Sequence, residues 1–263
     1  MSLLFFDIGN TNLKIGLYRE ASGLASYTLP TPRAGTADQL GLAITALLAC
    51  EAQAPETLTE ILAVSVVPPI NPLLRQACAR FLGRAPRFVP DDLPVPLENR
   101  YEKPEEVGAD RLVAAYAARR ARSERSVVSV DFGTATTFDV VQGSSYLGGL
   151  ICPGVLSSAR ALAADTAKLP RIDLEPQSLA LTIGRSTVES LNQGMLFGFA
   201  AMTEGILRRL SEHLGETPAV VATGGFAAQL ARVCPAVNDV RPELLLEGLR
   251  LVYEEWAQDT RRS

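Results

Sequence analysis

A stretch in the middle of the chain combines an aspartate, a glycine and a threonine between two apolar runs. Residues 127–130 are rich in valine and predict a buried strand. D-F-G-T at 131–134 predicts a tight turn, and 135–141 returns as a second strand. These residue types suit a turn that meets phosphate. Glycine lets the backbone approach closely, Thr134 offers a hydroxyl and an N–H group, and Asp131 can hold a cation.

The chain makes the same construction a second time near its N-terminus. Residues 3–6 are apolar, D-I-G-N-T at 7–11 predicts the turn, and 13–18 returns as a strand. A single turn of this type is common in structural hairpins, so the interpretation as a phosphate-binding turn depends on the duplication. The duplicated turn predicts two related lobes whose turns face each other across a cleft, with the phosphates of a nucleotide between them.

A third acidic residue stands at the start of a predicted helix. The proline-rich segment 91–109 is irregular, and a long segment of this kind is more often functional than not. It leads into Asp110 and Arg111, which open a helix over 111–122. Asp110 can be a helix N-cap and Arg111 a surface charge. Alternatively, Asp110 accepts a proton while Arg111 holds an anionic group of a substrate.

The composition limits the class of protein. The chain has 263 residues, of which 47% are hydrophobic and 21% charged, and its net charge is −4. These values are typical of a globular protein with a full core, and the acidic balance argues against a nucleic-acid-binding surface. No apolar run is long enough to span a bilayer, and the N-terminus lacks the features of a signal peptide. We therefore expect a cytoplasmic protein without membrane contact.

The cysteines and the histidine exclude several kinds of site. Four cysteines are widely scattered without a C-x-x-C motif, and we interpret them as buried thiols of a reducing compartment. His213 is the only histidine, which excludes a zinc site with several histidine ligands. The chain also lacks the P-loop, the dinucleotide-binding G-x-G-x-x-G after a strand and the G-x-S-x-G of hydrolases.

Helical and strand patterns alternate along the chain, which predicts an α/β fold. The polar residues 121–125 divide it into a lobe over 1–122, with the first turn and the 99–111 segment, and a lobe over 123–263, with the second turn. A loop is predicted at 167–173. Helices are predicted at 36–49, 71–82, 111–122, 155–164, 188–213, 226–233 and 243–258, and further strands at 25–29, 61–67, 88–90, 145–151 and 219–222.

Glycines recur at two further places. T-G-G at 223–225 turns a strand into a helix, a position that suits the ribose or base of a nucleotide. The long helix contains Gly194, Gly198 and Gly205, which would let other backbones pack closely or line a subunit interface.

Taken together, these motifs resemble those of the type III pantothenate kinases, also named in the Bvg accessory factor family. The resemblance covers nearly the whole chain, and the order and spacing of the motifs make it specific. It rests on D-I-G-N-T-N-L-K at 7–14, N-R-Y-E-K-P-E-E-V-G-A-D-R at 99–111, D-F-G-T-A-T-T at 131–137, Y-L-G-G-L-I-C-P-G at 146–154, I-G-R-S-T at 183–187 and T-G-G at 223–225.

The resemblance implies both a fold and an activity. The fold would consist of two duplicated ribonuclease-H-like lobes that close on ATP, as in acetate and sugar kinases, hsp70 and actin. The reaction would transfer the γ-phosphoryl group of ATP to the primary hydroxyl of pantothenate, giving 4′-phosphopantothenate in the first step of coenzyme A biosynthesis. Family members resemble one another in requiring Mg²⁺ and a monovalent cation, K⁺ or NH₄⁺, and in forming homodimers.

For the pantothenate side of the site, the resemblance implies a role for each matching residue. Asp110 would be the general base and would also contact the substrate. Pantothenate would be bound by Tyr101, Gly108, Ala109, Arg111 and Thr187.

For the ATP side, the resemblance implies two loops and two cations. Asp131 would bind K⁺ or NH₄⁺, and Asp7 would lie near Mg²⁺. The ATP phosphates would be bound by Thr134 and by the residues of the first loop, namely Asp7, Ile8, Gly9, Asn10, Thr11, Asn12, Leu13 and Lys14.

Two alternative functions stay open from the sequence. The first is a kinase of the same superfamily that phosphorylates another small alcohol, such as a sugar. The 99–111 segment argues against it. The second is a non-catalytic regulatory protein, which the other family name suggests. The presence of Asp7, Asp110 and Asp131 argues against lost catalysis.

Overall fold

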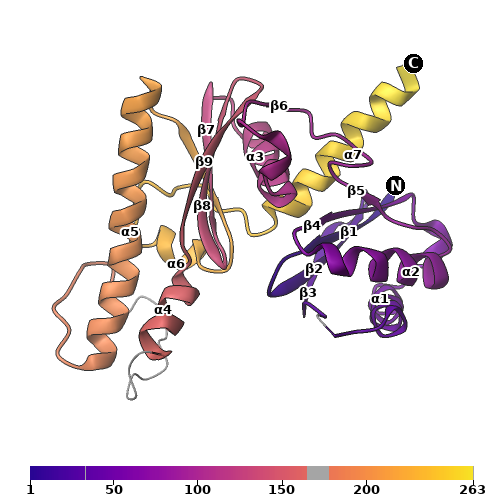
Figure 1. Cartoon of the computed structure of the whole chain (residues 1–263), viewed down its shortest axis with the longest axis horizontal. Coiled ribbons are helices and arrows are strands. Elements are labelled where there is room, and N and C mark those ends of the chain that lie inside the picture. The colour runs from indigo at the N-terminus through magenta and orange to yellow at the C-terminus, as the bar shows by residue number, and fades with distance from the viewer. Residues whose placement is uncertain (33, 165–177, 263) are drawn as a thin grey trace. The chain divides into compact units, whose positions relative to one another are not determined.

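The computed structural model describes residues 1–32, 34–164 and 178–262, and the chain divides into two compact units (Figure 1). Unit 1 consists of Met1–Leu97, Lys103–Ala117 and Leu245–Ser263, and unit 2 consists of Glu98–Glu102 and Ala118–Leu244. The loop that we predicted at 167–173 lies outside the described residues.

Unit 1 is built on a five-stranded mixed sheet with the order β3-β2-β1-β4-β5. The first three strands form an antiparallel meander, and β4 and β5 continue the sheet in parallel with β1. The central strand β1 is buried on both faces, as its apolar run predicts. The strands are β1 (Ser2–Ile8), β2 (Asn12–Arg19), β3 (Gly23–Pro30), β4 (Glu60–Ser65) and β5 (Arg87–Phe88).

Helices cover each face of the unit 1 sheet. Leu4 and Phe6 of β1 pack into a core with α1 (Ala37–Cys50) and α2 (Asn71–Leu82). Leu3 and Phe5, which point to the other face, pack with α3 (Ala109–Ala121) and α7 (Leu244–Arg262). Three short 3₁₀ helices complete the unit, at η1 (Pro55–Thr57), η2 (Pro68–Ile70) and η3 (Pro104–Glu106).

Unit 2 is built on a second five-stranded sheet with the order β10-β7-β8-β9-β6. Strands β7, β8 and β9 form an antiparallel meander, and β10 pairs in parallel with β7. The edge strand β6 pairs in parallel with β9. The strands are β6 (Glu98–Asn99), β7 (Ser126–Phe132), β8 (Ala135–Gln142), β9 (Ser145–Pro153) and β10 (Ala219–Thr223).

Three helices cover one face of the unit 2 sheet, as Figure 1 shows: α4 (Val155–Ala164), α5 (Thr187–Leu214) and α6 (Ala227–Ala231). Alternate residues of β7, namely Val128, Val130 and Phe132, pack against them in one core. Helix α5 begins where Ser186 accepts a hydrogen bond from the backbone of Glu189, so Ser186 is the cap. None of the described helices combines the length and the apolar character that a bilayer span requires.

The compact units depart from the lobes 1–122 and 123–263 in three segments, namely 98–102, 118–122 and 245–263. Helix α7 belongs to unit 1 because its apolar residues pack against Leu3 and Phe5 of β1. Glu98–Glu102 belongs to unit 2 because β6 adds to the edge of β9. Long-range packing and strand pairing decide these two assignments, and neither leaves a local pattern in the sequence.

One structural expectation for the long helix was wrong. We predicted that Gly194, Gly198 and Gly205 would let other backbones pack closely. Within the described part of the chain, no atom other than those of the neighbouring turns of α5 lies within 4 Å of where a Cβ would stand at these three positions.

Candidate active site

The second turn connects β7 to β8 and carries two of the predicted ligand-binding residues. Asp131 is the penultimate residue of β7, and Thr134 precedes β8. The N–H of Gly133 donates to the carbonyl of Ala135 at 3.0 Å, which closes the turn. From α4, the hydroxyl of Ser157 donates to the carbonyl of Thr134 at 2.7 Å. The sequence did not identify Ser157, because it lies on a helix without any motif of its own.

Two glycines from other parts of unit 2 approach this turn closely. Gly224 has a φ of +93°, and a Cβ there would collide with the carboxylate of Asp131. A Cβ at Gly154 would collide with the carbonyl of Thr134. Because β10 pairs in parallel with β7, Thr223 lies opposite Asp131. The T-G-G motif is therefore part of the same site as the second turn, and only glycine fits at these two positions.

The first turn, between β1 and β2, repeats this arrangement in unit 1. The N–H of Gly9 donates to the carbonyl of Asn12 at 3.0 Å. The hydroxyl of Thr31, which follows β3, donates to the carbonyl of Gly9 at 2.6 Å. Across the hairpin, Asp7 pairs with Lys14. Sequence reasoning missed Thr31, which closes the first turn as Ser157 closes the second.

Asp110 lies in the first turn of α3, which begins at Ala109, so the interpretation of Asp110 as only an N-cap is wrong. Its carboxylate is partly buried and accepts a hydrogen bond from the backbone N–H of Arg111 at 2.8 Å. Burial raises the pKa of Asp110 above its ordinary value, and the backbone N–H and charge of Arg111 partly offset this effect. A carboxylate with a raised pKa is a better proton acceptor.

The start of α3 and the first turn lie at the same edge of the unit 1 sheet. The N–H of Val66, just after β4, donates to the carbonyl of Ile8 at 3.1 Å. A Cβ at Gly108 would lie 3.7 Å from the side chain of Val66. Because β1 and β4 are parallel, their carboxyl ends meet at this edge. Unit 1 thus brings together the first loop and the segment Gly108–Arg111.

Tyr101 and Thr187 belong to unit 2. Tyr101 follows β6, and its backbone N–H donates to Asn99 Oδ1 at 3.0 Å. Its ring lies over Gly148 of β9, where a Cβ would stand 3.3 Å from Cδ2 of the ring. Thr187 is the first residue of α5, and its side chain is exposed.

The two candidate cation ligands belong to different units, Asp7 to unit 1 and Asp131 to unit 2. Among residues 1–32, 34–164 and 178–262, no three His, Cys, Asp or Glu side chains gather as a metal site would require. Mg²⁺ in phosphoryl-transfer enzymes is commonly held by one or two carboxylates and the substrate phosphates, so Asp7 fits that pattern. Asp131 offers a single carboxylate, which lies beside the backbone of Gly224.

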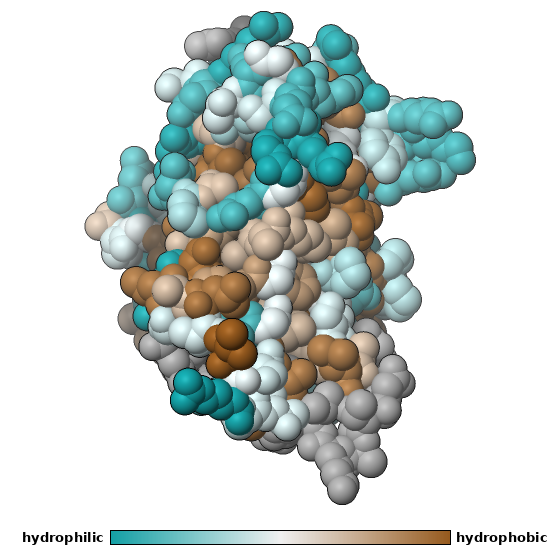
Figure 2. All heavy atoms as spheres, turned by 90° about the vertical axis from the view of Figure 1, so that its left-hand side faces the viewer, coloured by the Kyte–Doolittle hydropathy of each residue, from teal (hydrophilic) through white to brown (hydrophobic). Residues whose placement is uncertain are grey.

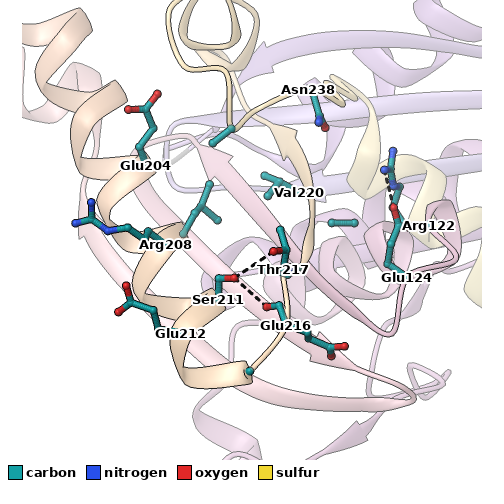
Figure 3. A pocket seen from close by; sticks show the side chains of 15 residues that line it. Arg122, Glu124, Glu204, Arg208, Ser211, Glu212, Glu216, Thr217, Val220 and Asn238 are labelled. Atoms are coloured by element: carbon teal, nitrogen blue, oxygen red, sulfur yellow. Dashed lines mark hydrogen bonds and ion pairs between the residues drawn. The ribbon is translucent and has the colours of Figure 1, made fainter.

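A pocket of about 840 Å³ lies elsewhere in unit 2, and Figure 3 shows its lining. It is formed by the C-terminal half of α5, the start of β10 and residues around Arg122 and Asn238. Ala219 in this pocket pairs with Val127 at the start of β7, whereas Thr223 pairs with Asp131 at the end. The pocket therefore lies at the end of the sheet opposite to the second turn, and none of the predicted site residues lines it.

Comparison with known structures supports the fold. A Campylobacter jejuni protein of the Baf family superposes with a TM-score of 0.60 at 19% identity, and the match covers 97% of this chain and 99% of that one. A ROK hexokinase from Thermus thermophilus superposes with a TM-score of 0.54 at 18% identity, with coverage of 97% and 99%. The predicted α/β fold of the actin-like class is confirmed.

Comparison with known sequences identifies the family. The family model described as type III pantothenate kinase matches residues 3–209. A type III pantothenate kinase from Nitratidesulfovibrio vulgaris (strain Miyazaki F) is 59% identical over 253 residues, which are 96% of this chain and 97% of that protein. The predicted resemblance is confirmed, and the chain belongs to the type III pantothenate kinase family.

Proposed function

We propose that the protein transfers the γ-phosphoryl group of ATP to the primary hydroxyl of pantothenate, giving 4′-phosphopantothenate, the first step of coenzyme A biosynthesis. The observation that carries this proposal is the position of Asp110. The chain belongs to the type III pantothenate kinase family, and its Asp110 lies at the start of α3, at the same edge of the unit 1 sheet as the first D-x-G-x-T turn. That the reaction takes place in the cytoplasm remains a prediction from the sequence.

In this mechanism Asp110 is the general base. Phosphoryl transfer through a loose transition state needs positioning and charge neutralisation more than covalent chemistry. The ionised Asp110 accepts the hydroxyl proton late in the transfer, and its raised pKa favours that step.

In the proposal, pantothenate is bound by residues of the 99–111 motif around Asp110 and by Thr187 of the 183–187 motif. Arg111 pairs with the pantothenate carboxylate, because guanidinium and carboxylate groups form paired hydrogen bonds. Tyr101 forms a wall of the pocket, and the remaining contacts come from Gly108, Ala109 and Thr187.

ATP is bound by both turns. The first loop, Asp7–Lys14, supplies backbone N–H groups and the Lys14 ammonium, and the second supplies Thr134. Backbone N–H groups beside glycine suit phosphate oxygens, since no side chain blocks the approach.

Two cations complete the proposed site. K⁺ or NH₄⁺ at Asp131 and Mg²⁺ near Asp7 supply positive charge that offsets the negative charge of the phosphates when bound. The residues opposite the two aspartates support a separate cation at the second turn. Lys14 lies opposite Asp7 in the first hairpin, whereas the uncharged Thr137 lies opposite Asp131 in the second.

We also propose a homodimer that uses the outer face of α5 and its neighbours. Figure 2 shows apolar side chains gathered on the face of the molecule that it presents. Exposed apolar residues of unit 2 include Ile151 of β9, Leu156 of α4 and Val188 of α5, and Gly194 and Gly198 leave open space on α5. Exposed apolar surface that gathers on one face, as in Figure 2, is typical of an interface. Analytical ultracentrifugation tests this, and a monomer at micromolar concentration would contradict it.

A coupled assay of ADP release tests the proposed reaction. ADP release should require pantothenate and should be faster with K⁺ than with Na⁺, and mass spectrometry should detect 4′-phosphopantothenate. A panel of sugars in place of pantothenate serves as the control. Preferential turnover of a sugar, or binding of pantothenate and ATP without turnover, would overturn the proposal.

A further inference from the structure

We propose that Asp139, Tyr146 and Gly148 together position Tyr101 for pantothenate binding. We call these three residues the Tyr101 seat. The inference rests on the proposed function, in which Tyr101 forms a wall of the pantothenate pocket. All four residues belong to unit 2.

The seat begins with a buried polar pair. Asp139 of β8 is 2% exposed, and Tyr146 of β9 is fully buried. The Tyr146 hydroxyl donates to Asp139 Oδ1 at 2.7 Å, and the Thr137 hydroxyl donates to Asp139 Oδ2 at 3.3 Å. A buried carboxylate is costly unless it is hydrogen-bonded, so the Tyr146 hydroxyl fixes where β9 lies against β8.

The next feature is a bulge in β9. Val140 pairs with Gly148 and Val141 pairs with Tyr146, so Leu147 has no opposite residue in the β8–β9 ladder. A bulge bends its strand and changes the direction of the side chains around it. Gly148 has a φ of +116°, a conformation that side chains rarely allow. The bulge therefore presents a flat backbone surface at Gly148.

Strand β6 brings Tyr101 onto this surface. Asn99 pairs with Tyr146, and the N–H of Arg100 donates to the carbonyl of Tyr146 at 2.9 Å. The hydroxyl of Ser145 donates to Glu98 Oε2 at 2.6 Å. Tyr146 thus holds β6 through its backbone while its side chain is anchored to Asp139.

The edge of the Tyr101 ring then lies against Gly148, because a Cβ there would stand 3.3 Å from Cδ2 and 3.4 Å from Cε2, closer than most real Cβ contacts. The segment that carries Tyr101 is short, since the chain belongs to unit 1 on either side of Glu98–Glu102. Its position in unit 2 therefore depends on the contacts with β9. Loss of the Tyr146 hydroxyl should move Tyr101 without touching Asp110 or the two turns.

The test compares steady-state kinetics of Tyr146→Phe with those of the parent enzyme. The KM for pantothenate should rise roughly 5–30-fold, the equivalent of one lost buried hydrogen bond, while the KM for ATP stays unchanged. Tyr27→Phe is the matched control, because the Tyr27 hydroxyl also donates to a carboxylate, that of Glu51 in unit 1. It should leave both KM values unchanged. An unchanged KM for pantothenate in Tyr146→Phe would overturn the inference.

A double-mutant cycle with Tyr101→Ala separates positioning from general destabilisation. If the seat acts through Tyr101, Tyr146→Phe should not raise the KM for pantothenate further in the Tyr101→Ala background. An equal rise in both backgrounds would overturn the seat. If Tyr101→Ala alone leaves the KM for pantothenate unchanged, the proposed role of Tyr101 fails, and the seat fails with it. The rest of the proposed function does not depend on that result.

Gly148→Ala is a second variant in case Tyr146→Phe does not fold. The added methyl group would stand 3.3 Å from the Tyr101 ring and should displace it. The expected result is again a higher KM for pantothenate with an unchanged KM for ATP. An unchanged KM for pantothenate in a folded Gly148→Ala enzyme would overturn the inference independently.

Discussion

The two D-x-G turns have similar backbone contacts, and they differ in loop length and in the residue opposite the aspartate. In each, a glycine N–H closes the turn, from Gly9 to Asn12 and from Gly133 to Ala135. In each, a hydroxyl from a distant element donates to a carbonyl of the turn, from Thr31 in the first and from Ser157 in the second. The duplication that the sequence suggests therefore extends to contacts that no motif contains.

The residue opposite each aspartate is where the turns differ. Asp7 pairs with Lys14 across its hairpin, whereas Asp131 pairs with the uncharged Thr137. The second turn is also enclosed by Gly154 and Gly224, whose closeness no other residue would permit. Two similar turns thus place a lysine opposite the aspartate in one case and an uncharged threonine in the other.

The largest expected effect lies outside both turns, at Asp110. Asp110→Asn should lower kcat by roughly 10²–10⁴-fold, the usual contribution of a general base, with little change in the KM for ATP. The matched control is Asp91→Asn, since Asp91 is an exposed aspartate of the same unit. Near-normal turnover of Asp110→Asn would remove Asp110 from the catalytic role and leave the two turns as the only candidates.

The next effect tests the difference in charge. Asp131→Ala should abolish activation by K⁺, so that the variant turns over equally fast in K⁺ and in Na⁺. Thr137→Lys should reduce the K⁺ dependence, because it gives the second turn the lysine that the first has at Lys14. Rates measured across a K⁺ titration at constant ionic strength check both variants. A parent-like K⁺ response in Asp131→Ala would show that the cation binds elsewhere.

A smaller effect concerns the pH dependence of the base. Burial raises the pKa of Asp110 and Arg111 lowers it, so the ionised base is lost at a higher pH than for an ordinary aspartate as the pH falls. Arg111→Met should raise the pKa of Asp110 further and move the acid limb of the kcat profile to higher pH. Arg111→Lys keeps the charge and should leave the limb near that of the parent. A limb that moves to lower pH in Arg111→Met would contradict this assignment.

The smallest effect tests the similarity of the turns. Thr31→Val and Ser157→Ala each remove one hydrogen bond to a turn carbonyl, so each should raise the KM for ATP by roughly 2–10-fold. Thr45→Val is the control, because the Thr45 hydroxyl donates to a carbonyl within α1, remote from both turns. An effect confined to one of the two turns would show that they share a shape but not a role.

Local features of the fold could be predicted from the sequence. The helix at Asn71–Leu82 and the helix at Val155–Ala164 have the predicted bounds, because apolar spacing and flanking prolines or glycines define them. The two hairpins follow from short apolar runs on each side of D-x-G. Such features depend on contacts between residues close in the chain, and a single sequence contains the information for them.

Features that depend on distant contacts could not be predicted. Helix α7 follows unit 2 in the chain yet packs in unit 1, and the two-residue strand β6 pairs with β9. Gly154 was noted only as the end of a motif, but it is required because the carbonyl of Thr134 lies against it. Gly194, Gly198 and Gly205 look alike in the sequence and have open space around them in the described structure.

The sequence by itself determined the family, the α/β class and the identity of the three acids at 7, 110 and 131. The physical reason is that a phosphate-binding turn or a helix start requires particular residue types at neighbouring positions, and a motif of this kind can be read from one sequence. Only the tertiary structure decided that Thr31 and Ser157 close the turns, that burial makes Asp110 a stronger base, and that a bulge in β9 supports Tyr101. Each of these depends on parts of the chain that are far apart in sequence and meet only when the sheets assemble.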